Sequence, residues 1–113
     1  KCKESVGERK IRLFLESQKI EYKYQKRFKD CNYKMTLPFD FYIPSLKILI
    51  EFDGIQHFKP ISIWGGEKAL ISQTERDEIK NNFAIQNNFK LIRISYVDLN
   101  KIDKILETII KIA

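Results

Sequence analysis

The sequence predicts a single α/β domain in which one mixed β-sheet is flanked by helices. Its 113 residues can bury one hydrophobic core but not two. Hydrophobic residues make up 43% of the chain and charged residues 32%, as in ordinary soluble globular proteins. Segments with helical and strand periodicity follow one another in the order αβββαβα, which is typical of a mixed sheet with helices packed on it.

The first elements are a helix over residues 6–18 and a strand over residues 20–28. Ser5 and Glu8 have the S-x-x-E spacing of a capping box, which satisfies free backbone amides at a helix start. The apolar residues that follow fall on one helical face: Ile11, Phe14 and Leu15. In residues 20–28, apolar and polar side chains alternate, which predicts a half-buried strand.

Two further strands, over residues 39–43 and 47–52, are predicted to pair as a hairpin. Pro38 and Pro44 bracket the first strand, and a tight turn at Pro44 and Ser45 leads into the second. The second strand is almost wholly apolar, which is typical of a strand buried on both faces.

A long loop is predicted over residues 54–73, because Gly and Pro recur there at Gly54, Pro60, Gly65 and Gly66. A loop of this length in so small a domain is usually functional. A second helix is then predicted over residues 74–88, with Thr74 as its N-cap and Asp77 three residues further on.

The chain closes with a strand and a helix. Residues 89–95 predict the strand, and Asp98 or Asn100 is expected to cap the helix that follows. The apolar stripe of this last helix comprises Ile102, Ile105, Leu106, Ile109 and Ile110.

The positive charge is concentrated at the start of the chain. The net charge is +6, and the first 34 residues contain 11 Lys and Arg against 5 Asp and Glu, whereas the rest contains 10 of each. Basic residues alternate here with aromatic ones, as in a groove that holds nucleic-acid phosphates. For the aromatic residues, a place in the core beneath a solvated strand face is the alternative interpretation. The basic residues taken as DNA contacts are Lys23, Lys26, Arg27 and Lys29.

A transmembrane role is excluded, and no secretory signal is visible. No run approaches the roughly 20 apolar residues that cross a bilayer, and residues 1–10 are charged rather than apolar. Because the chain lacks an initiating Met, we expect residues 1–113 to be one domain of a longer cytoplasmic protein. Its two cysteines, Cys2 and Cys31, are then reduced thiols. Cys2 is either a stray cysteine or the last ligand of a zinc-binding element outside this sequence.

Acidic residues interrupt the apolar strands at Asp40 and Glu51. Burying a carboxylate costs several kcal/mol unless a cation or a hydrogen-bond donor offsets it. Two antiparallel neighbours joined by a short turn bring both acids to the same edge of the sheet, where oxygen ligands suit Mg²⁺. The pair therefore predicts a metal site, and hydrolysis of nucleic acid fits both the acids and the basic first third of the chain.

Other polar residues near this pair have two interpretations each. His57 is the single histidine, and it is either a general acid or base or an ordinary surface or core imidazole. Glu8 and Asp77 are either functional or engaged only in helix capping. Asp53 is interpreted as a turn residue before a glycine. Two further residues are taken as candidate substrate contacts: Gln56 and Lys80.

Four segments resemble the very-short-patch-repair endonuclease branch of the PD-(D/E)XK nuclease superfamily. They are PFDF at 38–41, IEFDGIQHF at 50–58, ERD at 75–77 and LIRI at 91–94. Within this branch the chain is most similar to the phage-type homing endonucleases with the signature EDxHD. The resemblance extends over residues 7–96, and it implies the restriction-endonuclease-like fold.

The resemblance assigns roles to individual positions. It puts the first-helix glutamate at Glu8, the central metal ligand at Asp40 and the proton-transferring histidine at His57. Asp77 matches the last acidic position, and Glu51 matches a position that supplies a metal-ligating backbone carbonyl in the repair enzymes. The chain departs from the common E-x-K pattern because Phe52 and Asp53, rather than a lysine, follow Glu51; this favours His57 in the lysine's place.

The function implied is a DNA endonuclease that depends on Mg²⁺ or Mn²⁺ and acts on double-stranded DNA in a phage or bacterial host cell. The implied biological role is homing, with mismatch nicking and restriction as alternatives that use the same chemistry. A non-catalytic DNA-binding module on the same fold is the rival from another class. One active site per chain means that a double-strand break needs a homodimer or two successive nicks. A separate DNA-binding region is expected elsewhere in the full-length protein.

Overall fold

The computed structural model describes residues 4–55 and 66–112. These residues form three helices, four strands and two short 3₁₀ turns, and their order agrees with the predicted αβββαβα. The elements are α1 (Val6–Ser17), β1 (Lys23–Tyr33), β2 (Met35–Ile43), β3 (Ile48–Asp53), α2 (Gly66–Gln86), β4 (Lys90–Ser95) and α3 (Ile102–Ile112), with 3₁₀ turns at Pro44–Leu46 and Tyr96–Lys101.

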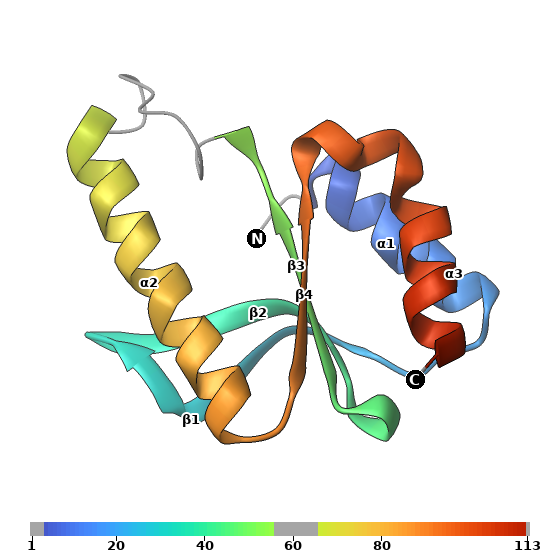
Figure 1. Cartoon of the computed structure of the whole chain (residues 1–113), viewed down its shortest axis with the longest axis horizontal. Coiled ribbons are helices and arrows are strands. Elements are labelled where there is room, and N and C mark those ends of the chain that lie inside the picture. Colours follow the sequence, from blue (N-terminus) through green and yellow to red (C-terminus); the bar gives the residue numbers. More distant parts are fainter. Residues whose placement is uncertain (1–3, 56–65, 113) are drawn as a thin grey trace.

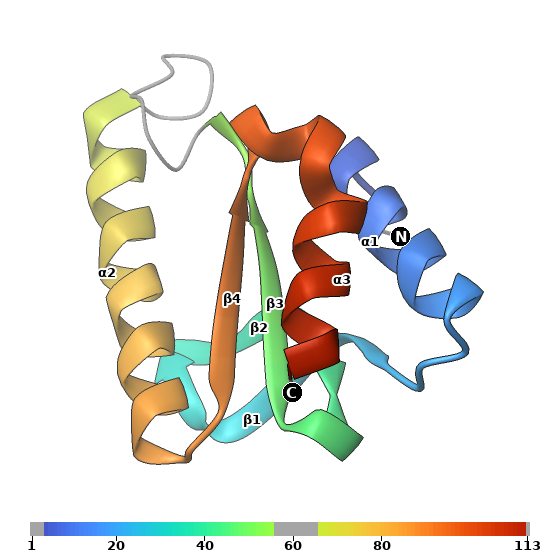
Figure 2. The same cartoon turned by 45° about the vertical axis from the view of Figure 1, so that its right-hand side comes forward.

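The strands form one mixed sheet in the order β1-β2-β3-β4. β1 pairs with β2 and β2 with β3 in antiparallel fashion, whereas β3 and β4 are parallel and α2 lies between them in sequence. Helix α2 covers one face of the sheet, and α1 and α3 lie together on the other (Figure 1). The turned view shows the same two layers around β3 and β4 (Figure 2). The prediction of a mixed sheet flanked by helices is therefore confirmed.

Each face of the sheet has its own hydrophobic cluster. The face toward α1 and α3, here called the α1/α3 face, buries Ile11, Leu15, Phe41, Ile43, Ile48, Ile50, Ile92, Ile94, Ile102 and Leu106. The face toward α2, here called the α2 face, buries Cys31, Leu37, Phe39, Leu49, Phe83 and Ala84. In β2, Phe39 belongs to the second cluster and Phe41 to the first, so Asp40 lies where the strand changes from one cluster to the other.

Helix α1 begins as predicted. The Ser5 hydroxyl accepts a hydrogen bond from the Glu8 amide, and the Glu8 carboxylate accepts one from the Ser5 amide, each at 3.1 Å. The capping box is therefore complete.

Strand β1 differs from the prediction because it spans Lys23–Tyr33 instead of residues 20–28. Ile20 and Tyr22 pack on the apolar cluster from the connection before the strand, so their alternation reflected burial and not strand pairing. Gln25 interrupts the strand with a φ of 57°, and the register with β2 shifts between Arg27 and Asn32.

The predicted hairpin is present, although β2 starts at Met35, earlier than expected. Phe41 pairs with Ile50 and Ile43 with Ile48. The turn consists of the 3₁₀ segment after Ile43 followed by Lys47 in the left-handed region, at φ 55° and ψ 43°.

The predicted loop over residues 54–73 is wrong from residue 66 onward, because α2 already begins at Gly66. Residues 56–65 lie outside the described part of the chain. Thr74 is therefore inside the helix, where its hydroxyl donates to the Leu70 carbonyl at 2.9 Å, and it does not cap the helix. The two glycines suggested a loop, but the residues after them, from Glu67 to Leu70, are good helix formers.

The helical segment after β4 begins earlier than predicted. Ser95 caps it, since its hydroxyl accepts from the Val97 amide at 3.2 Å, and the expected caps Asp98 and Asn100 lie inside the 3₁₀ turn. The apolar stripe of α3 is confirmed, with Leu106 fully buried. Within residues 4–55 and 66–112, no helix is long and apolar enough to cross a membrane.

Candidate functional site

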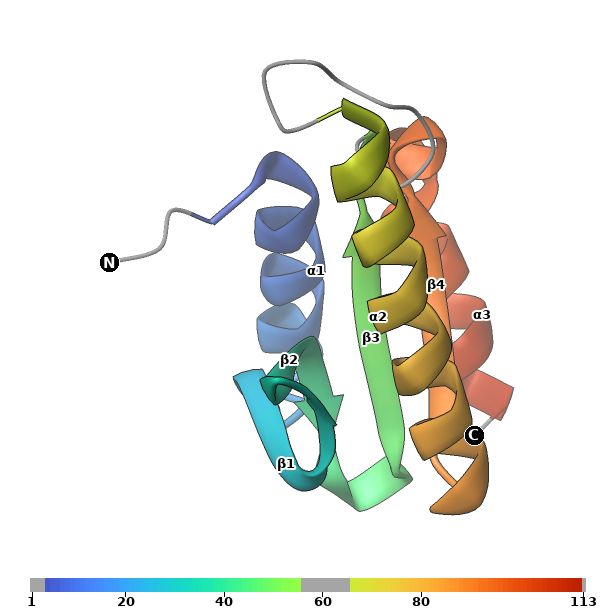
Figure 3. The same ribbon diagram turned by 90° about the vertical axis from the view of Figure 1, so that its left-hand side faces the viewer.

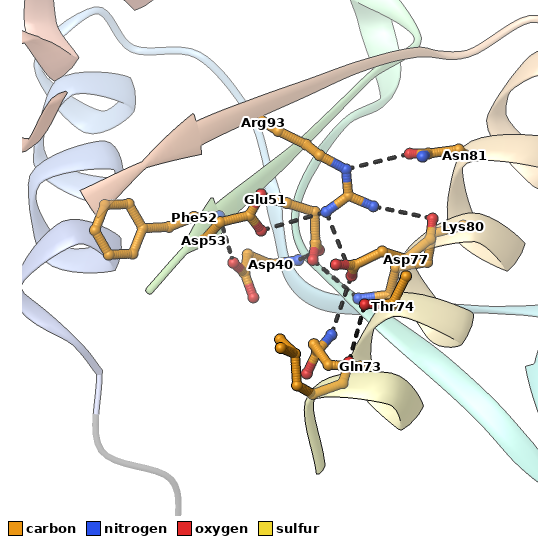
Figure 4. Close-up of polar contacts among 11 residues, drawn as sticks. Asp40, Glu51, Phe52, Asp53, Gln73, Thr74, Asp77, Lys80, Asn81 and Arg93 are labelled. Atoms are coloured by element: carbon orange, nitrogen blue, oxygen red, sulfur yellow. Dashed lines mark hydrogen bonds and ion pairs between the residues drawn. The ribbon is translucent and has the colours of Figure 1, made fainter. Parts of the chain in front are cut away.

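Asp40 and Glu51 meet where the backbone pairing of β2 with β3 stops. The last paired residues are Phe41 and Ile50. Beyond them, the Asp40 amide donates to Glu51 Oε2 at 2.7 Å, and the Phe52 amide donates to Asp40 Oδ2 at 2.8 Å (Figure 4). The two carboxylates thus accept hydrogen bonds that carbonyl groups accept elsewhere in the ladder. This carboxylate pair is the centre of the candidate site.

Burial makes the carboxylate pair hold protons more tightly than exposed carboxylates do. Glu51 is only 3% exposed. Loss of hydration raises the pKa of Asp40 from 3.8 to about 8, and the negative charge of Glu51 adds to the shift. Burial also raises the pKa of Glu51, against the opposing charge of Lys80. Within the described ranges no donor reaches Oδ1 of Asp40, which leaves this oxygen available to a ligand.

Lys80 lies inside this site and not on the surface. The sequence analysis takes it as a candidate contact to the DNA substrate, but it is 7% exposed and its ammonium lies 2.9 Å from Glu51 Oε1. The helical period contains the signal for this position, because Phe83 and Ala84, three and four residues further along α2, are also buried. A lysine on that face must point toward the sheet.

Arg93 joins β3, β4 and α2 through its guanidinium. Its Nη1 lies 3.3 Å from Asp53 Oδ1 and 3.5 Å from Asp77 Oδ1. Its Nη2 donates to the Asp77 backbone carbonyl at 3.1 Å, and Nε donates to Asn81 Oδ1 at 3.2 Å. Gln73 also donates to Asp77 Oδ1, at 3.0 Å. The arginine was not predicted as a site residue. It alternates in the LIRI segment with Ile92 and Ile94, which are buried toward α1 and α3, so strand alternation puts its side chain on the opposite face of the sheet, toward α2.

Two interpretations based on turns and caps are corrected here. Asp53 is not a turn residue: it is the last residue of β3 and is 6% exposed. Asp77 is not at the start of a helix, because it lies eleven residues after Gly66 in α2. Capping therefore does not explain Asp77, and both acids face the same arginine.

Glu8 has its capping role and also acts on the carboxylate pair. Besides the capping box, its Oε1 accepts a hydrogen bond from the Tyr24 hydroxyl at 3.1 Å. Its charge is also one cause of the raised pKa of Asp40. The preceding Gly7 lets the helix approach β3, since a Cβ at this position would lie 2.4 Å from the Phe52 ring.

The basic residues predicted to contact DNA lie along β1, the edge strand of the sheet. Lys23, Arg27 and Lys29 are exposed, whereas Lys26 is half-buried with its ammonium 5.2 Å from the centre of the Phe28 ring. The Arg27 guanidinium donates to Thr36 of β2. Phe28 packs on the α2 face, which supports the core interpretation of this aromatic residue.

Three residues of the sequence analysis cannot be placed. His57, Gln56 and Cys2 lie outside the described residues. Among the residues that are described, no group of three His, Cys, Asp or Glu side chains is arranged to hold a metal ion. A divalent cation on the carboxylate pair would complete its coordination with water, as Mg²⁺ commonly does.

Two viral proteins resemble this chain over about half of its length. The chain is 38% identical over 66 residues to the uncharacterized protein 307L of Invertebrate iridescent virus 6, and 38% identical over 63 residues to the uncharacterized protein 094L of Frog virus 3 (isolate Goorha). The matches cover 58% and 54% of this chain but only 34% and 41% of the two viral proteins. The chain thus matches well under half of these relatives. No protein-family model and no solved structure matches it.

Proposed function

We propose that this domain is a DNA endonuclease of the PD-(D/E)XK superfamily that depends on Mg²⁺ or Mn²⁺, and that it belongs to a homing endonuclease of the very-short-patch-repair branch. The element order αβββαβα and a sheet in which β3 is antiparallel to β2 and parallel to β4 support this proposal. Among the described residues of the segments that carry the resemblance, those at 38–41 lie on β2, those at 50–53 on β3, those at 75–77 on α2 and those at 91–94 on β4.

The carboxylate pair is the observation on which the proposal rests. Asp40 and Glu51 are hydrogen-bonded neighbours at the end of a backbone ladder, and burial raises the pKa of both. Such a pair favours a bound cation, and carboxylate oxygens are the ligands that Mg²⁺ and Mn²⁺ prefer. Asp40 and Glu51 would hold the ion. When bound, a divalent cation lowers the pKa of water and offsets the negative charge that develops on a phosphodiester.

The other residues would orient water, move protons and hold DNA. His57 would take a proton from the attacking water or give one to the leaving oxygen. Glu8 would orient that water, and Asp77, fixed by Arg93, would support the histidine. The β1 residues Lys23, Lys26, Arg27 and Lys29, together with Gln56, would bind the DNA backbone. Cutting both strands would require two copies of the chain or two nicks.

Plasmid cleavage tests the proposal. Supercoiled DNA incubated with the protein and Mg²⁺ or Mn²⁺ should be nicked or linearised, and EDTA should stop the reaction. Asp40→Asn and His57→Ala should each lower the rate at least about a hundredfold, the usual size of a lost general base or metal ligand. Asp103→Asn, which changes an exposed acid on α3, is the matched control and should cut like the wild type.

Two results would contradict the proposal. One is DNA binding without cleavage and without any effect of divalent cations, which would favour the non-catalytic binding module. The other is full activity of the His57→Ala protein, which would remove the histidine from the mechanism.

A further inference from the structure

Lys80 is a cation buried in the α2 face. Its side chain is 9% exposed and that of Glu51 is 4% exposed. The ammonium lies 2.9 Å from Glu51 Oε1 and 5.3 Å from the centre of the Phe39 ring. Replacing a buried ion pair with apolar side chains is often neutral or stabilising. Packing alone therefore does not account for a lysine at this position.

Lys80 and the backbone together hold both oxygens of Glu51. Oε1 accepts from the Lys80 ammonium and Oε2 from the Asp40 amide. A divalent cation that approaches Glu51 must therefore share Oε1 with a positive charge or displace it. Asp40 differs, because Oδ2 accepts from the Phe52 amide while Oδ1 has no donor among the described residues. Asp40 thus keeps one oxygen available to a ligand, whereas both oxygens of Glu51 already accept hydrogen bonds.

We propose that Lys80 is the resident counter-cation of Glu51, which neutralises this carboxylate in the metal-free protein and competes with a divalent cation for it. The inference rests on the proposed function only in treating the carboxylate pair as a divalent-cation site. Lys80 is a positioning residue that acts through Glu51 and does not touch the substrate. The Lys80–Glu51 ion pair keeps the site folded without metal, and an incoming divalent cation binds first at Asp40.

Thermal unfolding with and without Mn²⁺ tests this role without any measurement of activity. In Lys80→Met and Lys80→Gln, the increase in Tm caused by Mn²⁺ should be at least twice that of the wild type, because the competitor is gone and Glu51 lacks a cation. Lys80→Gln keeps a hydrogen-bond donor and is the variant to use if Lys80→Met does not fold without Mn²⁺. Lys80→Arg should restore a wild-type response. Lys68→Met, at an exposed lysine of the same helix, is the matched control.

A lysine with only a structural role would lower the Tm of the metal-free protein and leave the effect of Mn²⁺ unchanged. An equal or smaller Mn²⁺ response in both neutral variants would therefore overturn the proposal. If plasmid cleavage and the Mn²⁺ response of the wild type persist in that case, the endonuclease proposal stands alone. No Mn²⁺ response in the wild type or in either neutral variant would overturn the counter-cation and the cation site together.

Discussion

The two faces of the sheet bury different kinds of side chain. The core cluster on the α1/α3 face is wholly apolar, from Ile11 on α1 to Leu106 on α3. The α2 face combines an aromatic cluster with the buried charges Glu51 and Lys80, and Arg93 spans from β4 to α2 beside them. Viewed from its side of the molecule, α2 runs alongside β3 and β4 (Figure 3). Lys80 of α2 contacts Glu51 of β3, and Arg93 of β4 contacts the Asp77 carbonyl of α2, so the charged side chains connect this helix to both strands.

One strand contributes to both environments. Ile48 and Ile50 of β3 belong to the α1/α3 cluster, whereas Leu49 packs on the α2 face and Glu51 binds Lys80 of α2. Strand alternation therefore places the charges on one side only. Replacing a buried ion pair with apolar side chains is often neutral or stabilising, so we expect the charges on the α2 face to serve a task other than stability.

The largest effect on stability is expected from breaking the buried ion pair. Glu51→Ala leaves the Lys80 ammonium buried without its partner, so the free energy of unfolding should fall by about 3–5 kcal/mol. The double variant Glu51→Met with Lys80→Met should recover most of this loss and yet lack activity. Urea denaturation measures the free energy of unfolding of both variants. A double variant no more stable than Glu51→Ala would mean that the charged face does contribute to stability.

The apolar face is expected to respond by packing alone. Leu106→Ala opens a cavity between α3 and the sheet and should cost about 2–5 kcal/mol. Its cleavage rate at a temperature where it is folded should match the wild type, and so should its Tm increase with Mn²⁺. A lost Mn²⁺ response would show that the two faces are coupled.

The stability of the protein is expected to depend on pH through the carboxylate pair and not through the apolar α1/α3 face. Because the pKa of Asp40 is raised to about 8 by burial, the folded protein binds this proton more tightly than the unfolded chain does. The contribution of Asp40 to the stability of the metal-free protein should therefore be full below about pH 4 and be lost as the pH rises through about 8. Tm measured across this range should fall less in Asp40→Asn. An unchanged slope in that variant would assign the effect to another group.

The smallest effects are expected at the start of α1, where capping and chemistry coincide in Glu8. Ser5→Ala removes the N-cap and should cost about 1 kcal/mol. Glu8→Gln keeps a side chain that fits a capping box, so the free energy of unfolding should change by less than about 0.5 kcal/mol. Cleavage should nevertheless fall in Glu8→Gln if its charge is needed. If Glu8→Gln lost no more activity than Ser5→Ala for the same loss of stability, Glu8 would have only its capping role.

Local signals were sufficient for most of the fold. The capping box at Ser5 and Glu8 and the apolar stripe of α3 gave correct elements because each depends on neighbours within one or two turns. The start of α2 was missed because Gly66 suggested a loop, while the helix that follows is stabilised by packing on the sheet. The extent of β1 was missed since its pairing depends on β2 and on the irregularity at Gln25.

The site was predictable only in part for a similar reason. Asp40 and Glu51 were visible as acids inside apolar strands, and the structure brings them together. Their cationic neighbours come from α2 and β4, far along the chain, so no local pattern joins Lys80 or Arg93 to them. Asp53 was interpreted from the glycine after it, whereas its contact with β4 determines its role.

The contact between Gly7 and Phe52 ties the first helix to the strand that carries Glu51. Because even one methyl group at residue 7 would overlap the ring, any larger residue there requires the Phe52 ring to shift or a smaller residue at position 52. We therefore expect the two positions to vary together in a randomised library, with bulk exchanged between them. Selection for folded variants would then show which distances between α1, which carries Glu8, and β3, which carries Glu51, the fold accepts, without any nuclease assay.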